Sequence, residues 1–187
     1  MRVISGDLKG KKLSDPLDKS TRPLKDMVRE SIFNILEHSN KVSVEIYNAK
    51  VLDLFSGTGS FGIECLSRGA EKVIFFENYY NSLKILKYNI FKLKLENRST
   101  IYNYSAYNLK DSNLENTIFD IIFLDPPFKD KEVKSLIDQL KKLEVVSKHS
   151  IIVIHRNKKS DDKISQFLNI IEEKNYGLSK ILFCKLI

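Results

Sequence analysis

From residue 50 onward, the hydrophobic positions alternate between short continuous runs and runs with helical spacing. A short continuous apolar run is typical of a strand buried on both faces of a parallel sheet. Apolar residues that recur three and four positions apart indicate a helix that packs one face against a core. The predicted strands are 50–55, 72–76, 100–103, 118–124 and 150–155, and the predicted helices are 60–67, 81–93 and 131–143. This alternation predicts a mostly parallel α/β sheet with helices on both faces.

The C-terminal residues 169–187 predict two further strands around Gly177. No helix separates these two strands, so we expect them to pair as an antiparallel hairpin at the edge of the sheet. With the hairpin included, the pattern predicts a Rossmann-like α/β sheet of seven strands.

The first residues of the chain predict a basic extension that packs on the sheet domain. Short β-like pieces around Gly6 and Gly10 are typical of a β-hairpin or an extended arm. A helix is expected next, because Thr21 can cap it and Pro23 suits a first turn, where a missing N–H costs nothing. We therefore predict an extension over 1–40 and a sheet domain over 41–187.

Composition limits the class of protein. The chain has 187 residues, 42% hydrophobic and 29% charged, which fits one soluble domain with a full core. No apolar run is long enough to span a bilayer, and the N-terminus lacks a signal-peptide core. We therefore expect a cytoplasmic protein without a membrane partner, and a monomer requires no special feature.

Cysteine, histidine and charge bear on the choice of partner. Two cysteines and three scattered histidines show neither metal-ligand spacing nor a nucleophile–histidine arrangement, so we expect no metal site. The formal net charge of +7 permits a polyanionic partner such as nucleic acid without establishing one.

A glycine-rich loop follows the strand at 50–55. Gly57, Gly59 and Gly62 lie where the strand gives way to a helix, and free N–H groups at such a place can hold an anionic group. The spacing also fits the G-x-G-x-x-G motif of a nicotinamide-dinucleotide site, with Glu77 twenty residues after the first glycine. By itself, the loop does not distinguish a nicotinamide dinucleotide from another ligand with an anionic group.

Asp53, four residues before the first glycine, favours S-adenosylmethionine over a dinucleotide. A carboxylate inside the strand suits a ligand that has positive charge and lacks phosphate, and S-adenosylmethionine has an ammonium and a sulfonium group. Glu77, at the end of the next strand, can accept hydrogen bonds from both ribose hydroxyls. The loop N–H groups can then hold the carboxylate of the ligand.

The tetrapeptide Asp125-Pro126-Pro127-Phe128 follows the apolar strand 118–124. Two prolines stiffen the turn and remove donors, which leaves the Asp125 carboxylate and the Pro126 carbonyl as rigid acceptors. Together they can accept both hydrogens of an exocyclic NH2 group and stabilise charge as its nitrogen attacks a methyl carbon. Phe128 can stack on the base. An ordinary proline turn is the alternative, and the glycine loop upstream favours the catalytic interpretation.

The chain as a whole resembles the RsmD family of bacterial 16S rRNA guanine-N2 methyltransferases. The specific part of the resemblance is the opening at 1–13, followed by Thr21-Arg22-Pro23 and by 28–36. The segments 51–62 and 119–128 complete it, although many amino-methyltransferases share them. The resemblance implies methyl transfer from S-adenosylmethionine to guanine N2 of 16S rRNA, with the base turned out of the stack. We expect 16S rRNA as the partner, within an assembling 30S particle, although the sequence leaves naked rRNA open as the substrate.

Motifs and resemblance together nominate three sets of site residues. The catalytic set is Asp125, Pro126, Pro127 and Phe128. The cofactor-binding set is Asp53, Phe55, Ser56, Gly57, Thr58, Gly59, Glu77, Asn78, Ser105, Ala106 and Arg22. The RNA-binding set is Arg2, Lys9, Lys11, Lys12, Arg22 and Arg29.

The sequence departs from the family pattern at two places. After the third strand the family tends to have an aspartate that reaches the adenine amine, and we place Ser105 at that position. Near the end of the fifth strand the family often has a glutamate. His155 or Arg156 stands there, and the sequence assigns neither of them a role.

Three other functions stay open at this point. A DNA adenine-N6 methyltransferase could use the same tetrapeptide, but it usually needs a target-recognition region for which the chain has no room. A dinucleotide-dependent oxidoreductase would bind NADH and would give the two prolines no role. A non-catalytic RNA-binding assembly factor would keep only the fold, which the intact glycine loop and acceptor turn argue against.

Overall fold

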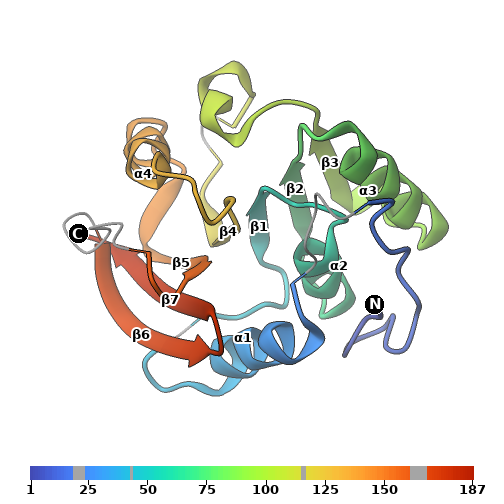
Figure 1. Ribbon diagram of the computed structural model, residues 1–187, viewed down its shortest axis with the longest axis horizontal. Helices are drawn as coiled ribbons and strands as arrows, with labels where there is room; N and C mark the ends of the chain where they lie inside the picture. The colour runs from blue at the N-terminus through green and yellow to red at the C-terminus, as the bar shows by residue number, and fades with distance from the viewer. Residues whose placement is uncertain (19–23, 43, 115–116, 161–167) are drawn as a thin grey trace.

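The computed structural model of the protein describes residues 1–18, 24–42, 44–114, 117–160 and 168–187. One seven-stranded sheet crosses the molecule in the order β3-β2-β1-β4-β5-β7-β6 (Figure 1). The strands are β1 Lys50–Leu54, β2 Lys72–Phe76, β3 Ser99–Tyr102, β4 Phe119–Leu124, β5 Val146–Asn157, β6 Leu168–Tyr176 and β7 Ser179–Leu186. The helices are α1 Asp26–His38, α2 Ser60–Ser67, α3 Tyr80–Lys92 and α4 Val133–Lys142, with the short 3-10 helices η1 Glu96–Arg98 and η2 Ala106–Asp111.

Strand pairing confirms the predicted sheet. Strands β1 to β5 pair in parallel, and β7 runs antiparallel to both β5 and β6. The predicted C-terminal hairpin is therefore confirmed, with β7 between β5 and the edge strand β6. Its register pairs Ser179 with Asn157, which brings the start of β7 beside the end of β5.

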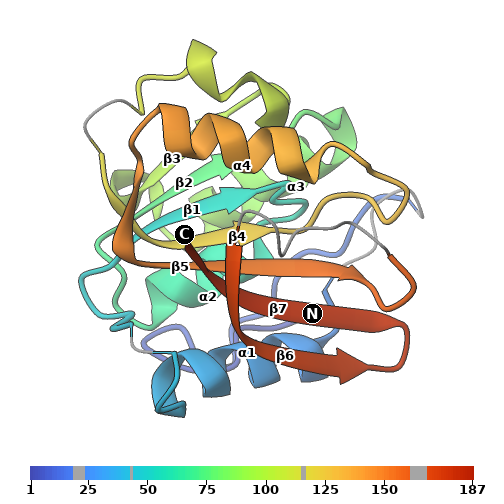
Figure 2. The same ribbon diagram turned by 90° about the vertical axis from the view of Figure 1, so that its left-hand side faces the viewer.

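Helices cover both faces of the sheet (Figure 2). Along β1, Val51 packs into the core shared with α1, α2 and α3, whereas Leu52 packs into the core shared with α4. Successive strand residues point to opposite faces, so a strand covered on both sides is apolar at most of its positions. None of the helices in the described ranges has both the length and the apolar character needed to cross a membrane.

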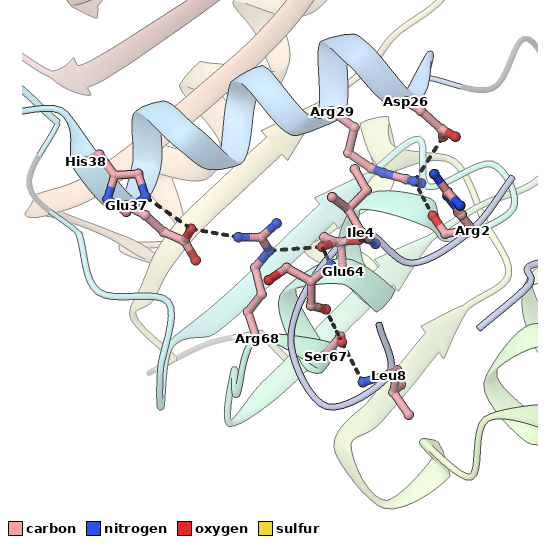
Figure 3. A network of polar contacts seen from close by, with 11 residues as sticks. Arg2, Ile4, Leu8, Asp26, Arg29, Glu37, His38, Glu64, Ser67 and Arg68 are labelled. Atoms are coloured by element: carbon pink, nitrogen blue, oxygen red, sulfur yellow. Dashed lines mark hydrogen bonds and ion pairs between the residues drawn. The ribbon is translucent and has the colours of Figure 1, made fainter. Parts of the chain in front are cut away.

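The N-terminal loop, residues 1–13, folds back on itself and lies against α2 (Figure 3). Arg2 and Lys12 form an isolated antiparallel bridge, which favours the hairpin over the extended arm as the form of this segment. The buried Glu64 of α2 accepts hydrogen bonds from the N–H groups of Ile4 and Ser5 at 2.8 and 2.9 Å. Because both donors belong to the loop backbone, Glu64 fixes the position of the loop whatever its surface side chains are.

Helix α1 begins at Asp26, later than the sequence pattern suggested. The predicted cap at Thr21 and first-turn Pro23 lie outside the described residues. Lys25 occupies the N-cap position without a side-chain capping hydrogen bond. The inward face of α1, which includes Val28 and Ile32, packs in the core as its spacing predicts.

Gly6 and Gly10 offer a matched test of how the N-terminal loop is held. Both have positive φ, +79° and +81°, so alanine should cost each about 1 kcal/mol of backbone strain. A Cβ on Gly6 would also lie 1.9 Å from the carbonyl oxygen of Ser67, whereas one on Gly10 would meet nothing within 4 Å. We expect Gly6→Ala to lower the free energy of unfolding by about 3 kcal/mol and Gly10→Ala by about 1 kcal/mol in urea titrations. Equal losses would show that the loop does not dock on α2.

Candidate active site

A cavity lies where the sheet reverses its strand order. The chain runs from β1 to β2 and β3 on one side and returns through β4 on the other side. Ligands of open α/β sheets bind beyond the carboxyl ends of the strands at such a point. The cavity has a volume of about 450 Å³ and is walled by residues from 53–61, 77–79 and 123–128, with Leu24 and His155.

The glycine loop shapes one wall of the cavity. Gly57 and Gly59 have φ of +57° and +85°, which side-chain-bearing residues rarely adopt. A Cβ on Gly59 would lie 2.4 Å from the side chain of Leu86 in α3. Gly59 is also the N-cap residue of α2, and Ser60 in the first turn lines the cavity. The loop therefore brings backbone N–H groups and a helix N-terminus to this wall.

Asp53 is fully buried at the floor of the cavity. Its Oδ2 accepts a hydrogen bond from the N–H of Gly62 at 3.0 Å, while its Oδ1 has no hydrogen-bond partner among the described residues. Burial raises the pKa of Asp53 to about 8, the Gly62 hydrogen bond opposes the rise, and the charges of Asp125 and Glu77 add to it. A buried carboxyl with an unpartnered oxygen is costly unless a ligand completes it, and a cation does so best.

Glu77 is held at the end of β2 by two backbone donors. Its Oε2 accepts from the N–H of Gly57 and its Oε1 from the N–H of Tyr79, each at 2.7 Å. Burial raises the pKa of Glu77, and these hydrogen bonds oppose the rise. Each carboxylate oxygen keeps a second lone pair, so a rigidly held carboxylate can still accept hydrogen bonds from a ligand.

The turn at 125–128 forms the opposite wall, and all four of its residues line the cavity. The buried Arg156 of β5 donates hydrogen bonds to the carbonyl oxygens of Pro127 at 3.0 Å and Asp130 at 2.6 Å. The Oδ1 of Asp125 lies 2.7 Å from Nδ1 of His155. The ring of Phe128 meets the imidazole edge-on, with centroids 5.5 Å apart. Neighbouring strand β5 thus fixes both the backbone and the carboxylate of the turn.

Comparisons with known proteins find similarity over nearly the whole chain. The family model described as Conserved hypothetical protein 95 matches residues 1–185. The Ribosomal RNA small subunit methyltransferase D of Buchnera aphidicola (subsp. Acyrthosiphon pisum) is 35% identical over 178 residues, which cover 95% of this chain and 85% of that protein. The chain belongs to the RsmD family.

Two further matches cover nearly the whole length of the chain. The YlbH protein of Bacillus subtilis is 33% identical over 187 residues, covering 99% of this chain and 98% of its own length. The solved structure of yhhF from Escherichia coli aligns with a TM-score of 0.82 at 26% identity, over 100% of this chain and 97% of that one. The predicted Rossmann-like methyltransferase fold is thereby confirmed.

The RsmD family and the fold imply a cofactor of the S-adenosylmethionine type, and the cavity fits one. The orphaned Asp53 Oδ1 suits an ammonium group, and the glycine loop offers N–H groups to a carboxylate. Of the predicted cofactor residues, those that line the cavity are Asp53, Phe55, Ser56, Gly57, Thr58, Glu77 and Asn78. Gly59 shapes the loop without lining the cavity.

Two predicted cofactor residues lie elsewhere, and the position of a third is not described. Ser105 and Ala106 do not line the cavity, and the Oγ of Ser105 instead accepts a hydrogen bond from the N–H of Tyr107 at the start of η2. Arg22 lies outside the described residues. An adenine contact from Ser105 stays a prediction, and its side chain already serves as a helix cap in this structure.

The predicted RNA contacts divide into exposed and buried residues. Arg2, Lys9, Lys11 and Lys12 are exposed on the N-terminal loop. Arg29 requires a correction, because its side chain is fully buried and donates to the carbonyl oxygen of Arg2 and to Asp26. Its place on the inward face of α1 removes it from any surface that could bind RNA.

Sequence reasoning missed the wall contributed by β5. His155 and Arg156 were assigned no role, yet both contact the turn at 125–128. Their position at the carboxyl end of a strand next to β4 was the available signal, because parallel strands bring such ends together. Among the described residues, no group of three His, Cys, Asp or Glu side chains could hold a metal ion.

Proposed function

We propose that the protein transfers a methyl group from S-adenosylmethionine to the exocyclic N2 amine of a guanine in 16S rRNA. The observation that carries the proposal is that Asp125 and Pro126 line the same cavity as Asp53 and Glu77. The naming of the Buchnera relative as a small-subunit rRNA methyltransferase supports the substrate class.

The cofactor would be held by three groups of the chain. Asp53 Oδ1 accepts from the ammonium, Glu77 accepts from the ribose hydroxyls, and the N–H groups of the glycine loop donate to the carboxylate. When bound, S-adenosylmethionine supplies a methyl group activated by a positively charged sulfur. The chain fixes its orientation, which matters because the methyl carbon must lie in line with the attacking nitrogen.

The amine is positioned by the turn at 125–128. The Oδ2 of Asp125 has no hydrogen-bond partner among the described residues, so it is available to accept one amine hydrogen while the Pro126 carbonyl accepts the other. Two acceptors stabilise the positive charge that develops on nitrogen, and the carboxylate lies next to the proton that must leave. Phe128 offers a ring on which the flipped base can stack.

We propose that the exposed Lys9, Lys11 and Lys12, with Arg2 and Arg22, contact rRNA phosphates, within an assembling 30S particle. We propose that the protein acts as a monomer in the cytoplasm and that the reaction needs no metal ion. The N-terminal loop would position RNA accurately, because Glu64 and Ser67 of α2 fix its backbone.

The decisive experiment supplies methyl-labelled S-adenosylmethionine to small-subunit particles that lack the modification. We expect label on N2 of one guanine, located by mapping of the methylated nucleotide. Label on adenine N6 when DNA is supplied in a parallel reaction, or none on small-subunit RNA with cofactor bound, would contradict the proposal. The first result would support the adenine alternative and the second the non-catalytic one.

A further inference from the structure

Helix α3 presents lysine and aromatic side chains together on its solvent face. Tyr80, Tyr88 and Phe91 are 73%, 51% and 70% exposed. Lys84, Lys87 and Lys92 are exposed among them. The spacings of one, three and four residues place all six on one side of the helix, opposite the buried Leu83, Leu86 and Ile90.

This face has a composition suited to single-stranded nucleic acid. The helix contains no Asp or Glu, so no carboxylate of α3 opposes its lysines. Aromatic rings exposed side by side to water are unfavourable, and such a patch often marks a binding surface. Exposed rings stack on bases of any sequence, and lysines between them contact phosphates.

Helix α3 contacts both the N-terminal loop and the glycine loop. The Nζ of Lys92 donates to the carbonyl oxygen of Lys12 at 3.1 Å, and α3 and the N-terminal segment lie side by side (Figure 1). The buried Asn89 accepts from the N–H of Ser14 at 2.9 Å and donates to the carbonyl oxygen of Thr58 at 3.0 Å. Tyr79, which precedes α3, lines the cavity.

The carboxylate of Asp18 lies at one end of this surface. Asp18 accepts hydrogen bonds from the Tyr79 hydroxyl and from the side-chain amide of Asn81, each at 2.7 Å. These hydrogen bonds hold the carboxylate at the end of α3 nearest the cavity. The lysines further along the helix face the solvent without an acidic neighbour on α3.

We propose that this face of α3 binds a single-stranded segment of rRNA that flanks the target guanine. The inference rests on the proposed function and adds a binding surface to it. Bases next to a flipped nucleotide are unstacked from their neighbours and gain most from aromatic surfaces. Lys84, Lys87 and Lys92 extend the phosphate-contacting row that Lys9, Lys11 and Lys12 begin.

The test uses paired substitutions on two faces of the sheet. Tyr88→Ala with Phe91→Ala removes rings, and Lys84→Ala with Lys87→Ala removes charges. Lys141→Ala with Lys142→Ala on the opposite side, in α4, is the control for charge. Affinity for an unmodified 16S rRNA transcript and for small-subunit particles is measured over a series of salt concentrations.

We expect the ring pair to weaken RNA binding at least tenfold without changing its salt dependence. The α3 lysine pair should reduce the slope of log affinity against log salt by about 1.4, and the α4 pair should leave it unchanged. Phe91→Tyr, which keeps a ring, should bind like the wild type. Cofactor affinity should be unaffected in all variants, which shows that each one folds.

The inference would be overturned if the ring variant and the α3 lysine variant both bound RNA as the α4 control variant does. Methylation of small-subunit RNA by the wild type would in that case still support the proposed function. Failure of the wild type to methylate small-subunit RNA is a separate result that contradicts the proposed function.

A second inference concerns His155, which contacts Asp125 and Ser179. Its Nδ1 lies 2.7 Å from Asp125 Oδ1, and its Nε2 lies 2.9 Å from the Oγ of Ser179. With Asp125 ionised, Nδ1 carries the hydrogen and donates, so Nε2 of a neutral ring accepts from the Ser179 hydroxyl. The geometry points to His155 as a positioning residue that occupies Oδ1 and leaves Oδ2 for the amine.

Amide substitutions separate the two ring nitrogens of His155. His155→Asn keeps a donor near Nδ1 and should retain most activity, whereas His155→Gln and His155→Ala should lower kcat about 10- to 100-fold. KM for S-adenosylmethionine should be unchanged in all three, which a general loss of structure would not produce. Equal kcat values for Asn and Gln would overturn the assignment.

Discussion

Asp125→Ala should lower the rate of methyl transfer by about 100- to 1000-fold and leave S-adenosylmethionine bound with nearly wild-type affinity. The carboxylate faces the nitrogen on which positive charge develops, and its position is fixed in advance by His155. Removing such a preorganised group raises the barrier without weakening ground-state binding. Asp125→Asn should be similarly slow, because an amide keeps the shape but loses the charge.

Single-turnover methylation of unmodified small-subunit particles measures the rate, and titration calorimetry with S-adenosylmethionine measures the affinity. Gln139→Ala on α4, outside the cavity, is a control for nonspecific effects of substitution. A wild-type rate in Asp125→Ala, with cofactor binding retained, would exclude the proposed mechanism.

The sheet and its loops could be predicted because their signals are local. A strand such as β4 has successive apolar positions because both of its faces are covered, and that shows directly in 121–124. The glycine loop is equally legible, since a positive φ at Gly57 and Gly59 restricts which residues can stand there.

Features that depend on tertiary neighbours could not be predicted. Arg29 looked like a surface cation, yet α1 buries it against the N-terminal loop, where the carbonyl of Arg2 accepts from it. His155 gained its role only when β5 paired with β4 and β7 brought Ser179 beside it. Each contact joins residues distant in the chain, so periodicity contains no information about it.

Asp53→Asn should weaken S-adenosylmethionine binding about 30-fold at pH 7. Loss of a buried, charge-assisted hydrogen-bond partner would by itself weaken binding by more than this. Burial raises the pKa of Asp53 to about 8, however, so at pH 7 the free wild-type protein must first ionise this group, which reduces its affinity. Wild-type affinity should therefore rise with pH up to about 8 and then level off. The affinity of Asp53→Asn should lack this rise. Binding at pH 7 should release a proton, measured by calorimetry in buffers of different ionisation enthalpy.

The same substitution should have the opposite effect on the stability of the free protein. The folded pKa of about 8 lies above the ordinary value of 3.8, so the native state binds more protons than the unfolded state between these limits. Stability should consequently fall as pH rises through this window and stay level above about 8. Burial also raises the pKa of Glu77, which adds the same fall in stability with pH to the wild type and to Asp53→Asn. The difference in stability between these two proteins therefore reports Asp53 alone.

Urea unfolding at pH 5 and pH 8.5 measures this difference. Asp53→Asn should lose less stability than the wild type between the two pH values and should be the more stable protein at pH 8.5. Parallel losses in the two proteins would show that Asp53 is ionised at pH 5 in the folded chain. The cavity would then hold its negative charge without a ligand. A buried carboxylate with an unpartnered oxygen lowers the stability of the free protein and raises its affinity for a cationic ligand. Ligand binding therefore explains why the chain has Asp53 at this buried position.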